Sequence, residues 1–359
     1  MRWSSSGPEK AAAILAETPL RRSCEAAKEH RLSDPAVTPR HRPDAGGVVV
    51  SEREPVMGWP HRSLLDVDQL TRAELEQCLD LAVEMRDRRA RRERLETLRG
   101  EVVGLAFCEP STRTRVSFEL AATALGAQVV DLPIEASSVT KGESLVDTLR
   151  TLERTGIGTI VLRHSMSGAP YLAARSTGAR IVNAGDGTHA HPTQALLDAL
   201  TLREALGSLE GTKIAIVGDI GHSRVARSNM HSLTALGASV CLAGPPAWVA
   251  GFEDWPGVTV AASLEEALAD ADAVMALRIQ LERVADGDRP SLGDYTAAWG
   301  LNEARMALAR PGAPLLHPGP TNEGVEITAD LADGARSLIG TQVANGVPVR
   351  MAVLSLLAR

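Results

Sequence analysis

The chain has 359 residues, which exceeds one typical domain and predicts two. Charged residues make up 23% of it, as is usual for a soluble globular protein, and the formal net charge of -7 argues against a general nucleic-acid binder. No apolar run approaches the length of a membrane span, and the four scattered cysteines form no CxxC pair or disulfide pattern. We therefore expect a cytoplasmic protein without a membrane or nucleic-acid partner.

Residues 1–56 differ in composition from the rest of the chain. Stretches such as SSSGPEK, LSDPAVTPRHRPDAGG and SEREP are rich in proline, serine, glycine and charge, with little periodic apolar patterning. Such a composition cannot bury enough apolar surface to offset the entropy lost on ordering. We expect a disordered N-terminal extension, and the alternative is that Met57 is the true first residue.

From Ser63 onward, helical and strand patterns alternate. The stretch LTRAELEQCLDLAVEMRDRRARR predicts a helix with a charged, solvated face. Short apolar runs then predict strands over Val102–Phe107, Gln128–Leu132, Thr159–Arg163 and Arg180–Ala184. Helices are expected between them, among others over Gly142–Arg154 and Pro170–Ser176.

A second series of strands begins with KIAIVGD at Lys213. Its further strands are expected over Val240–Ala243, Val258–Ala261, Ala273–Leu277 and Pro314–Leu316. A helix over His191–Gly207, with Pro192 in its first turn, joins the two series and marks the domain junction. The alternation predicts an α/β fold of two domains, 57–200 and 201–344, each a parallel β-sheet flanked by helices. The segment NGVPVRMAVLSLLAR, residues 345–359, predicts an apolar helix that docks on one of them.

The stretch EPSTRTRVSFE follows the first predicted strand and opens a helix. It places Ser111, Thr112, Arg113 and Thr114 at a helix N-terminus, where backbone N–H groups and the helix dipole favour an anion. The alternative is that Ser111 only caps the helix while Arg113 pairs with a surface acid. That alternative weakens because the other strand ends carry the same kind of group.

Ligands of open α/β sheets bind beyond the carboxyl ends of the strands. The polar groups expected there are Arg163, His191, Gln194, Arg224, Arg278, Gln280 and the turn in LLHPGP. This set holds cations and neutral donors but no obvious nucleophile with a base. It suits an anionic substrate that is activated by electrostatics and positioning. For Arg278, the alternative is an ion pair with Glu282 on a surface loop.

Metal and dinucleotide sites are weaker interpretations. Asp186, His189 and His191 could be metal ligands, but they lack a clear coordination pattern. The stretch GDIGHS follows a strand and contains glycines, yet it is not GxGxxG. We therefore expect no metal and no cofactor.

The motifs STRTR…FE, KGES, RH, HPTQ, SRVARS, RIQLER and HPGP occur in this order between Ser63 and the C-terminus. In these motifs and their order the chain resembles the aspartate and ornithine carbamoyltransferases. The first motif is typical of both branches. The R-x-Q-x-E-R and HPGP motifs resemble the aspartate branch, since ornithine enzymes typically carry a cysteine in an H-C-L-P turn. Thr140 before Lys141, and Glu323 after the HPGP turn, depart from the family pattern.

The resemblance implies transfer of the carbamoyl group of carbamoyl phosphate to the amine of L-aspartate, giving N-carbamoyl-L-aspartate and phosphate, in pyrimidine biosynthesis. It implies that domain 57–200 binds carbamoyl phosphate, that domain 201–344 binds aspartate, and that helix 345–359 packs back on the first. It also implies a homotrimer with active sites shared between subunits. Relatives variously add a dihydroorotase or a regulatory chain as partner.

The resemblance also implies roles for individual residues. The carbamoyl phosphate set comprises Ser111, Thr112, Arg113, Thr114, Ser137, Lys141, Arg163, His191, Gln194, Gly319 and Pro320. Within it, the first four would hold the phosphate, Thr114, Arg163 and His191 would polarise the carbonyl, and Gln194 would hold the amino end. Ser137 and Lys141 lie in a loop like the one that a neighbouring subunit donates. Lys141, Arg224, Arg278 and Gln280 would bind aspartate, and the catalytic residues would be Arg113, Thr114, Lys141, Arg163 and His191.

Three other functions compete with this one. The chain could be a carbamoyltransferase for another amino acid, or a non-catalytic homologue retained for assembly. The intact Arg113, Lys141, Arg163, His191 and Arg278 argue against the non-catalytic homologue. A nicotinamide dehydrogenase ranks last because the GxGxxG fingerprint is missing.

Overall fold

The computed structural model of the chain describes residues 58–132, 144–284 and 291–358. The expected N-terminal extension, Ser137 and Lys141 lie outside the described residues. Residues from Val56 to Arg359 form one compact unit that contains both predicted sheets.

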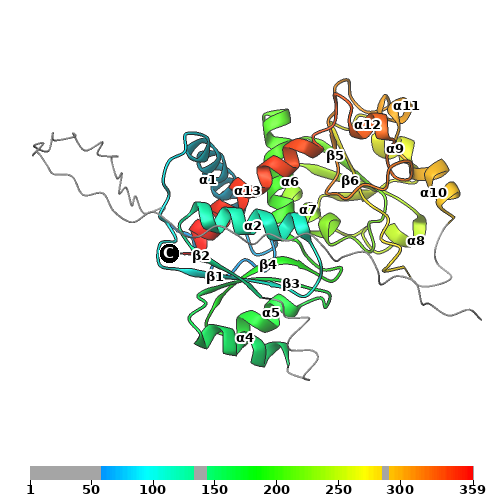
Figure 1. Cartoon of the computed structure of the whole chain (residues 1–359). Coiled ribbons are helices and arrows are strands. Elements are labelled where there is room, and N and C mark those ends of the chain that lie inside the picture. The colour runs from blue at the N-terminus through cyan, green and yellow to red at the C-terminus, as the bar shows by residue number, and fades with distance from the viewer. Residues whose placement is uncertain (1–57, 133–143, 285–290, 359) are drawn as a thin grey trace, which may run out of the picture. The chain divides into compact units, whose positions relative to one another are not determined.

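The first sheet is parallel throughout, with the strand order β2-β1-β3-β4 (Figure 1). Its strands are β1 (Val102–Phe107), β2 (Gln128–Leu132), β3 (Thr159–His164) and β4 (Arg180–Asp186). On β1, Val103 pairs with Val129 of β2 and with Thr159 of β3. The edge strand β2 is the more exposed one, whereas β1, β3 and β4 are mostly buried. This explains why the three buried strands read as continuous apolar runs.

Helices cover both faces of this sheet (Figure 1). They are α1 (Arg72–Ala90), α2 (Thr112–Ala124), α4 (Leu145–Arg154) and α5 (Ala169–Ser176). Successive side chains of a strand point to opposite faces. Accordingly, Leu105 of β1 joins a core with Phe118 of α2, whereas its neighbour Ala106 joins one with Leu149 of α4.

The second sheet is also parallel, in the order β7-β6-β5-β8-β9. Its strands are β5 (Lys213–Val217), β6 (Ser239–Ala243), β7 (Val258–Val260), β8 (Ala273–Ala276) and β9 (Leu315–Leu316). Around it lie α7 (Arg224–Ala235), α8 (Pro246–Val249), α9 (Leu264–Leu268), α10 (Leu292–Trp299), α11 (Glu303–Met306) and α12 (Ala329–Ala332). Ile216 of β5 packs in a core with Leu233 of α7, and Val217 in another with Leu268 of α9. The prediction of two parallel sheets covered by helices is therefore confirmed.

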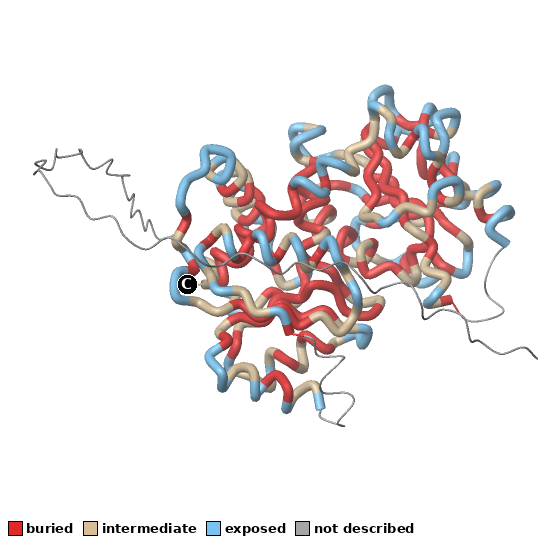
Figure 2. The backbone as a smooth tube through the Cα atoms, viewed as in Figure 1, coloured by how far each residue is buried: buried red, intermediate tan, exposed pale blue. Residues whose placement is uncertain are grey.

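Two long buried helices, α6 (Pro192–Leu206) and α13 (Ile339–Leu357), run through the core (Figure 2). The C-terminal helix packs against α1, α2 and α6. A helix that is apolar all round is expected to be buried in this way. Helix α13 begins at Ile339, earlier than the predicted residue 345. Its first turns hold the polar and glycine-containing stretch IGTQVAN, which the apolar pattern does not predict as part of the helix.

The predicted domain boundary between residues 200 and 201 falls inside helix α6, which continues to Leu206. Composition does not change along this helix, so the sequence pattern could not place the boundary at its end. Within the described part of the chain, the helices are too short or too polar to cross a bilayer.

Candidate active site

The N-terminus of α2 is open to a ligand. Ser111 is its N-cap residue, but the Ser111 side chain makes no capping hydrogen bond, and no acidic residue lies in the first turn. Within the described residues Arg113 has no ion pair, and its partial burial lowers its pKa. Among the described residues, the structure therefore does not show the alternative in which the Ser111 side chain caps the helix and Arg113 pairs with a surface acid. An uncapped helix N-terminus with an unpaired guanidinium is suited to a phosphate group.

The HPGP turn lies directly against Arg113. Gly319 has a φ of +65°, and a Cβ added to it would collide with the guanidinium of Arg113. The turn is held by His317, whose Nδ1 accepts a hydrogen bond of 2.8 Å from the N–H of Gly319. Glycine is favoured here by its backbone conformation, and the missing Cβ also leaves the guanidinium of Arg113 in its place. The structure places Gly319, which precedes Pro320, next to Arg113 in the first turn of α2.

A carboxylate that follows β1 collects arginines from three other segments. Glu109 Oε1 accepts hydrogen bonds from Arg163 Nη2 at 2.5 Å and from Arg224 Nη2 at 2.6 Å. Arg283 Nη2 lies 3.8 Å from Glu109 Oε2. Burial pushes the pKa of Glu109 upward, but the hydrogen bond and charge of Arg224 and the charge of Arg163 outweigh it, so the pKa lies below its usual value. We call Glu109, Arg163, Arg224 and Arg283 the arginine hub.

The arginine hub contains two residues that the sequence analysis did not assign to the site, Glu109 and Arg283. Both lie at the edge of motifs that were recognised, EPSTRTR and RIQLER. Cations and neutral donors at strand ends indicate an anion site, whereas an acid beside them does not. The sequence feature that indicates Glu109 is its position two residues before the N-cap of the predicted helix.

Arg163 and His191 are both buried within this region. Burial, together with the charge of Arg224, lowers the pKa of Arg163 to about 10, so the side chain stays charged at neutral pH. Burial, followed by the charges of Arg163 and Arg224, holds the pKa of His191 well below its usual value. His191 is therefore a neutral imidazole that can donate one hydrogen bond without carrying a charge. Its backbone N–H donates to Ser228 Oγ at 3.0 Å.

The predicted aspartate-binding residues Arg224, Arg278 and Gln280 each have a different partner in this structure. Arg224 belongs to the arginine hub, whereas Arg278 is paired with Glu282 in the segment after β8. Gln280 Nε2 donates to the carbonyl oxygen of His222 at 2.9 Å. The Arg278–Glu282 pair is the alternative that the sequence left open, and it is present in this structure.

In the group Asp186, His189 and His191, the carboxylate of Asp186 is bonded by donors of the protein itself. Asp186 accepts hydrogen bonds from the backbone N–H groups of Gly168 and Ala190 and from the side chain of Asn183. His189 Nδ1 lies 3.2 Å from Asp186. The carboxylate of Asp186 thus organises the loop that follows β4.

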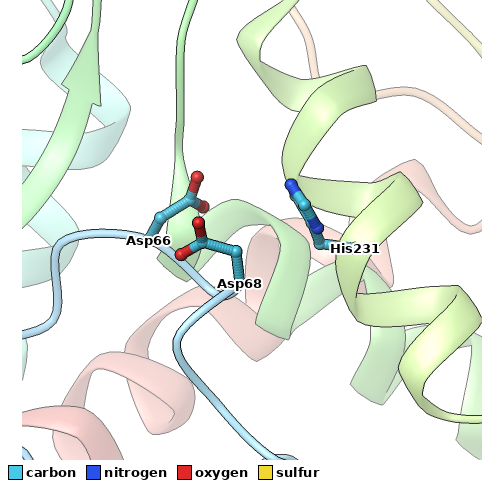
Figure 3. A group of neighbouring side chains, drawn as sticks. All are labelled: Asp66, Asp68 and His231. Carbon is cyan, nitrogen blue, oxygen red and sulfur yellow. The ribbon is translucent and has the colours of Figure 1, made fainter. Parts of the chain in front are cut away.

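A different cluster has a composition suited to a metal. Asp66, Asp68 and His231 face one another across the space between the segment before α1 and helix α7 (Figure 3), with their ligand atoms within 4.8 Å of one another. Asp68 and His231 also line a shallow cavity of about 400 Å³ whose lining contains no arginine or lysine. The carboxylate of Asp68 in its lining, with no arginine or lysine beside it, makes this cavity unsuitable for an anionic substrate. The arginine hub and the α2 N-terminus are the better candidate.

Asp66 titrates in an unusual range. It is buried, and burial raises the pKa of its carboxyl to about 6. Between pH 4 and pH 6 the folded state therefore holds a proton that the unfolded state has lost, so the free energy of unfolding falls as pH rises through this window. The shift of about two units corresponds to roughly 3 kcal/mol.

We expect Asp66→Asn to abolish this dependence. The difference in unfolding free energy between wild type and Asp66→Asn should fall by roughly 3 kcal/mol from pH 4 to pH 7, measured by urea denaturation. Asp68→Asn, at the exposed neighbouring carboxyl, is the control and should keep most of the wild-type dependence. Parallel pH profiles for wild type and Asp66→Asn would show that Asp66 has an ordinary pKa.

The fold is an α/β fold in which helix α6 joins two parallel sheets. The candidate site combines an open helix N-terminus with buried arginines from both halves, and this combination suits small anions. Residues 62–204 match the family model described as the aspartate/ornithine carbamoyltransferase carbamoyl-P binding domain. Residues 210–357 match the model described as the Asp/Orn binding domain of the same family. The chain therefore belongs to the aspartate/ornithine carbamoyltransferase family.

Individual relatives agree with this assignment. The aspartate carbamoyltransferase catalytic subunit of Sorangium cellulosum is 52% identical over 302 residues, which cover 84% of this chain and 94% of the relative. That of Caldanaerobacter subterraneus is 50% identical over 296 residues, covering 82% and 97%.

Solved structures show the same fold. The aspartate transcarbamoylase of Trypanosoma cruzi in complex with carbamoyl phosphate has a TM-score of 0.75 and 32% identity, covering 82% of this chain and 95% of its own. The ornithine carbamoyltransferase of Thermus thermophilus has a TM-score of 0.74 and 30% identity, covering 83% and 99%.

Proposed function

We propose that the chain transfers the carbamoyl group of carbamoyl phosphate to the amine of L-aspartate, giving N-carbamoyl-L-aspartate and phosphate. Relatives of about 50% identity carry the name of the aspartate enzyme, and the T. cruzi enzyme has been solved with carbamoyl phosphate and aspartate together. The observation that carries the proposal is the open N-terminus of α2, where Arg113 lies against Gly319 and has no ion pair with another described residue. A step in pyrimidine biosynthesis is part of the same proposal.

The phosphate end of the first substrate would be bound at the start of α2. The backbone N–H groups there, the hydroxyls of Ser111 and Thr112, and Arg113 supply donors and positive charge. Negative charge accumulates on the phosphate as the carbon–oxygen bond to it breaks. Donors that are already in place stabilise that charge without reorganising during the reaction.

The carbonyl end would be polarised by Arg163, His191 and Thr114. The lone pair of the aspartate amine attacks the carbamoyl carbon, the bond to the phosphate oxygen breaks, and one proton leaves the nitrogen. Negative charge develops on the carbonyl oxygen before the phosphate departs. A charged Arg163 and a neutral His191 in a buried setting can stabilise this oxygen more strongly than water would.

Aspartate would replace carboxylates that the protein itself supplies. In this structure Arg224 is ion-paired with Glu109, and Arg278 is ion-paired with Glu282. A substrate with two carboxylates offers both arginines a partner of the same chemistry. Arg278 is partly exposed on a segment after β8, so exchanging Glu282 for a substrate carboxylate requires only a local change.

The domain assignment, the assembly and the location belong to this proposal too. The family models divide the matched chain into 62–204 and 210–357, close to the predicted carbamoyl-phosphate and aspartate domains. We propose a homotrimer in which Ser137 and Lys141 complete a neighbouring subunit's site, with a regulatory chain or a dihydroorotase as possible partners. A cytoplasmic location agrees with the free thiols of Cys78 and Cys241.

A steady-state assay for carbamoyl-aspartate, run beside a native mass measurement, tests the function and the assembly together. We expect turnover with aspartate, little with ornithine, and the mass of a trimer. Turnover only with another amino acid would redirect the substrate assignment. No turnover with any amine would favour a non-catalytic homologue.

Sharing of the site between subunits can be tested by complementation. Arg113→Ala and Lys141→Ala chains should each be nearly inactive alone. After they are dissociated and reassembled together, some activity should return, because certain interfaces then combine two intact halves. Mixed trimers, verified by mass, that recover no activity would contradict a shared site.

A further inference from the structure

Asp198 lies fully buried in the middle of α6 and is not part of the predicted site. Three side-chain amides from three helices donate to it. Gln194 Nε2 of α6 and Gln342 Nε2 of α13 reach Oδ1 at 2.9 and 2.7 Å, and Asn229 Nδ2 of α7 reaches Oδ2 at 2.8 Å. Each amide therefore turns its NH₂ group toward one carboxylate.

Burial raises the pKa of Asp198 to about 6, although the amide bonds and the charge of Arg350 on α13 oppose this. At neutral pH the carboxyl is therefore mostly ionised, and an ionised carboxylate can only accept hydrogen bonds. A buried carboxylate without donors would be costly, so the three amides are held in the orientation that satisfies it.

This orientation determines what Gln194 can offer a ligand. The two ends of a glutamine amide differ only in that one donates and the other accepts. Because Nε2 of Gln194 is turned to Asp198, its Oε1 is left as an acceptor for a group on the other side. A carbamoyl group carries an NH₂ donor at the position where an acetyl group carries a methyl.

We propose that Asp198 is a positioning residue that holds Gln194 with its Oε1 as an acceptor, so that the site selects a carbamoyl phosphate over an acyl phosphate of the same shape. The inference rests on the proposed function, since it concerns the amino end of the carbamoyl donor. The inference adds Asp198 to the proposed site as a residue that acts through Gln194. It also explains a preference for carbamoyl over acyl phosphates by the orientation of the Gln194 amide.

Asp198 is also connected to the HPGP turn, through the side chain of Gln342. Because Nε2 of Gln342 donates to Asp198, its Oε1 is free to accept from the N–H of His317 at 2.9 Å. His317 in turn holds Gly319, which packs against Arg113. Asp198 therefore links Gln194 and the HPGP turn, two parts of the proposed carbamoyl phosphate set.

The test is Asp198→Asn, which keeps the shape of the side chain but can present an NH₂ group to Gln194. Gln194 can then turn its oxygen toward residue 198, which removes the acceptor from the ligand side. We expect the KM for carbamoyl phosphate to rise on the order of 10- to 100-fold, the range for leaving one buried polar group unpaired. Any shift of the HPGP turn through Gln342 affects all three phosphates alike, so the inhibition constants of acetyl phosphate and inorganic phosphate measure that shared effect. The KM for carbamoyl phosphate should rise clearly more than these two constants, because only carbamoyl phosphate has the amino group.

Two variants serve as controls. Asn229→Ala removes a different partner of Asp198 without touching Gln194, so it should keep the preference for carbamoyl over acetyl phosphate. In a Gln194→Ala background, adding Asp198→Asn should change this preference no further, because the group through which Asp198 acts is gone. Equal weakening of all three ligands by Asp198→Asn would overturn the proposal and leave a purely structural role.

The wild-type protein gives a measurement that does not depend on a variant folding. Lowering the pH below about 6 protonates Asp198, which can then donate, so the preference for carbamoyl over acetyl phosphate should fall. The ratio cancels the titration of the two phosphates, and Arg350, facing Asp198 from α13, keeps its charge throughout this range. A ratio that is flat from pH 5 to pH 8 in an active wild-type enzyme would contradict the inference and leave the proposed function standing.

Discussion

Replacing Arg113 with alanine is expected to lower kcat by roughly 10²–10³-fold while changing aspartate binding much less. Arg113 lies at the open N-terminus of α2, where the leaving phosphate would gain negative charge, and it has no ion pair within the part of the chain that the structure describes. A donor that is aimed at developing charge contributes more to the transition state than to the bound substrate. Steady-state kinetics with both substrates varied would separate kcat from the two KM values.

Arg115→Ala is the matched control for this prediction. Arg115 lies on the same helix two residues later, but it is paired with Asp131 at 2.8 Å on the surface. Its loss should leave kcat within about 2-fold, since exposed ion pairs contribute little. Near wild-type turnover in Arg113→Ala would rule out its role in holding the phosphate.

The second large effect is expected from Arg278, which we propose binds a carboxylate of aspartate. Arg278→Ala should raise the aspartate KM and lower kcat, with carbamoyl phosphate binding little changed. The expected loss is roughly 2–5 kcal/mol, as for truncating one partner of a desolvated charge pair. A planar guanidinium fork matches a carboxylate better than lysine does, so Arg278→Lys should recover only part of the loss.

Isothermal titration with carbamoyl phosphate first and a succinate-like dicarboxylate second measures this effect directly. Glu282→Gln is the informative companion, because it removes the carboxylate that now pairs with Arg278. It should bind the dicarboxylate at least as tightly as wild type if the substrate has to displace Glu282. If Arg278→Ala bound the dicarboxylate as tightly as wild type, Arg278 would not bind aspartate and the Glu282 pair would be its whole role.

Much of the fold could be predicted because local pattern and burial coincide. Strands β1 and β2 begin and end where their apolar runs do, at Val102–Phe107 and Gln128–Leu132. Helix α13 was predicted too short and the boundary at residue 200 was placed inside α6. The first turns of α13 are polar, unlike its buried remainder, whereas α6 is buried along most of its length, so an apolar pattern marks neither the start of α13 nor the end of the first domain.

The candidate site was predictable to a lesser extent. The motifs identified the cations that follow the strands and the open N-terminus of α2. They did not identify Glu109, whose bonds to Arg163 and Arg224 span 54 and 115 positions of the chain. Nor did they identify Asp198, because an aspartate inside a helix is usually a surface residue.

The sequence by itself determined the alternation of strands and helices, the parallel sheets and the types of side chain at the strand ends. These follow from periodicity and from the rule that strand ends carry the ligand-binding groups of such sheets. Only the tertiary structure decided which charges meet. An ion pair or a buried carboxylate depends on distances between segments far apart in the chain, and burial then sets whether His191 is neutral, Glu109 ionised and Asp198 satisfied by amides.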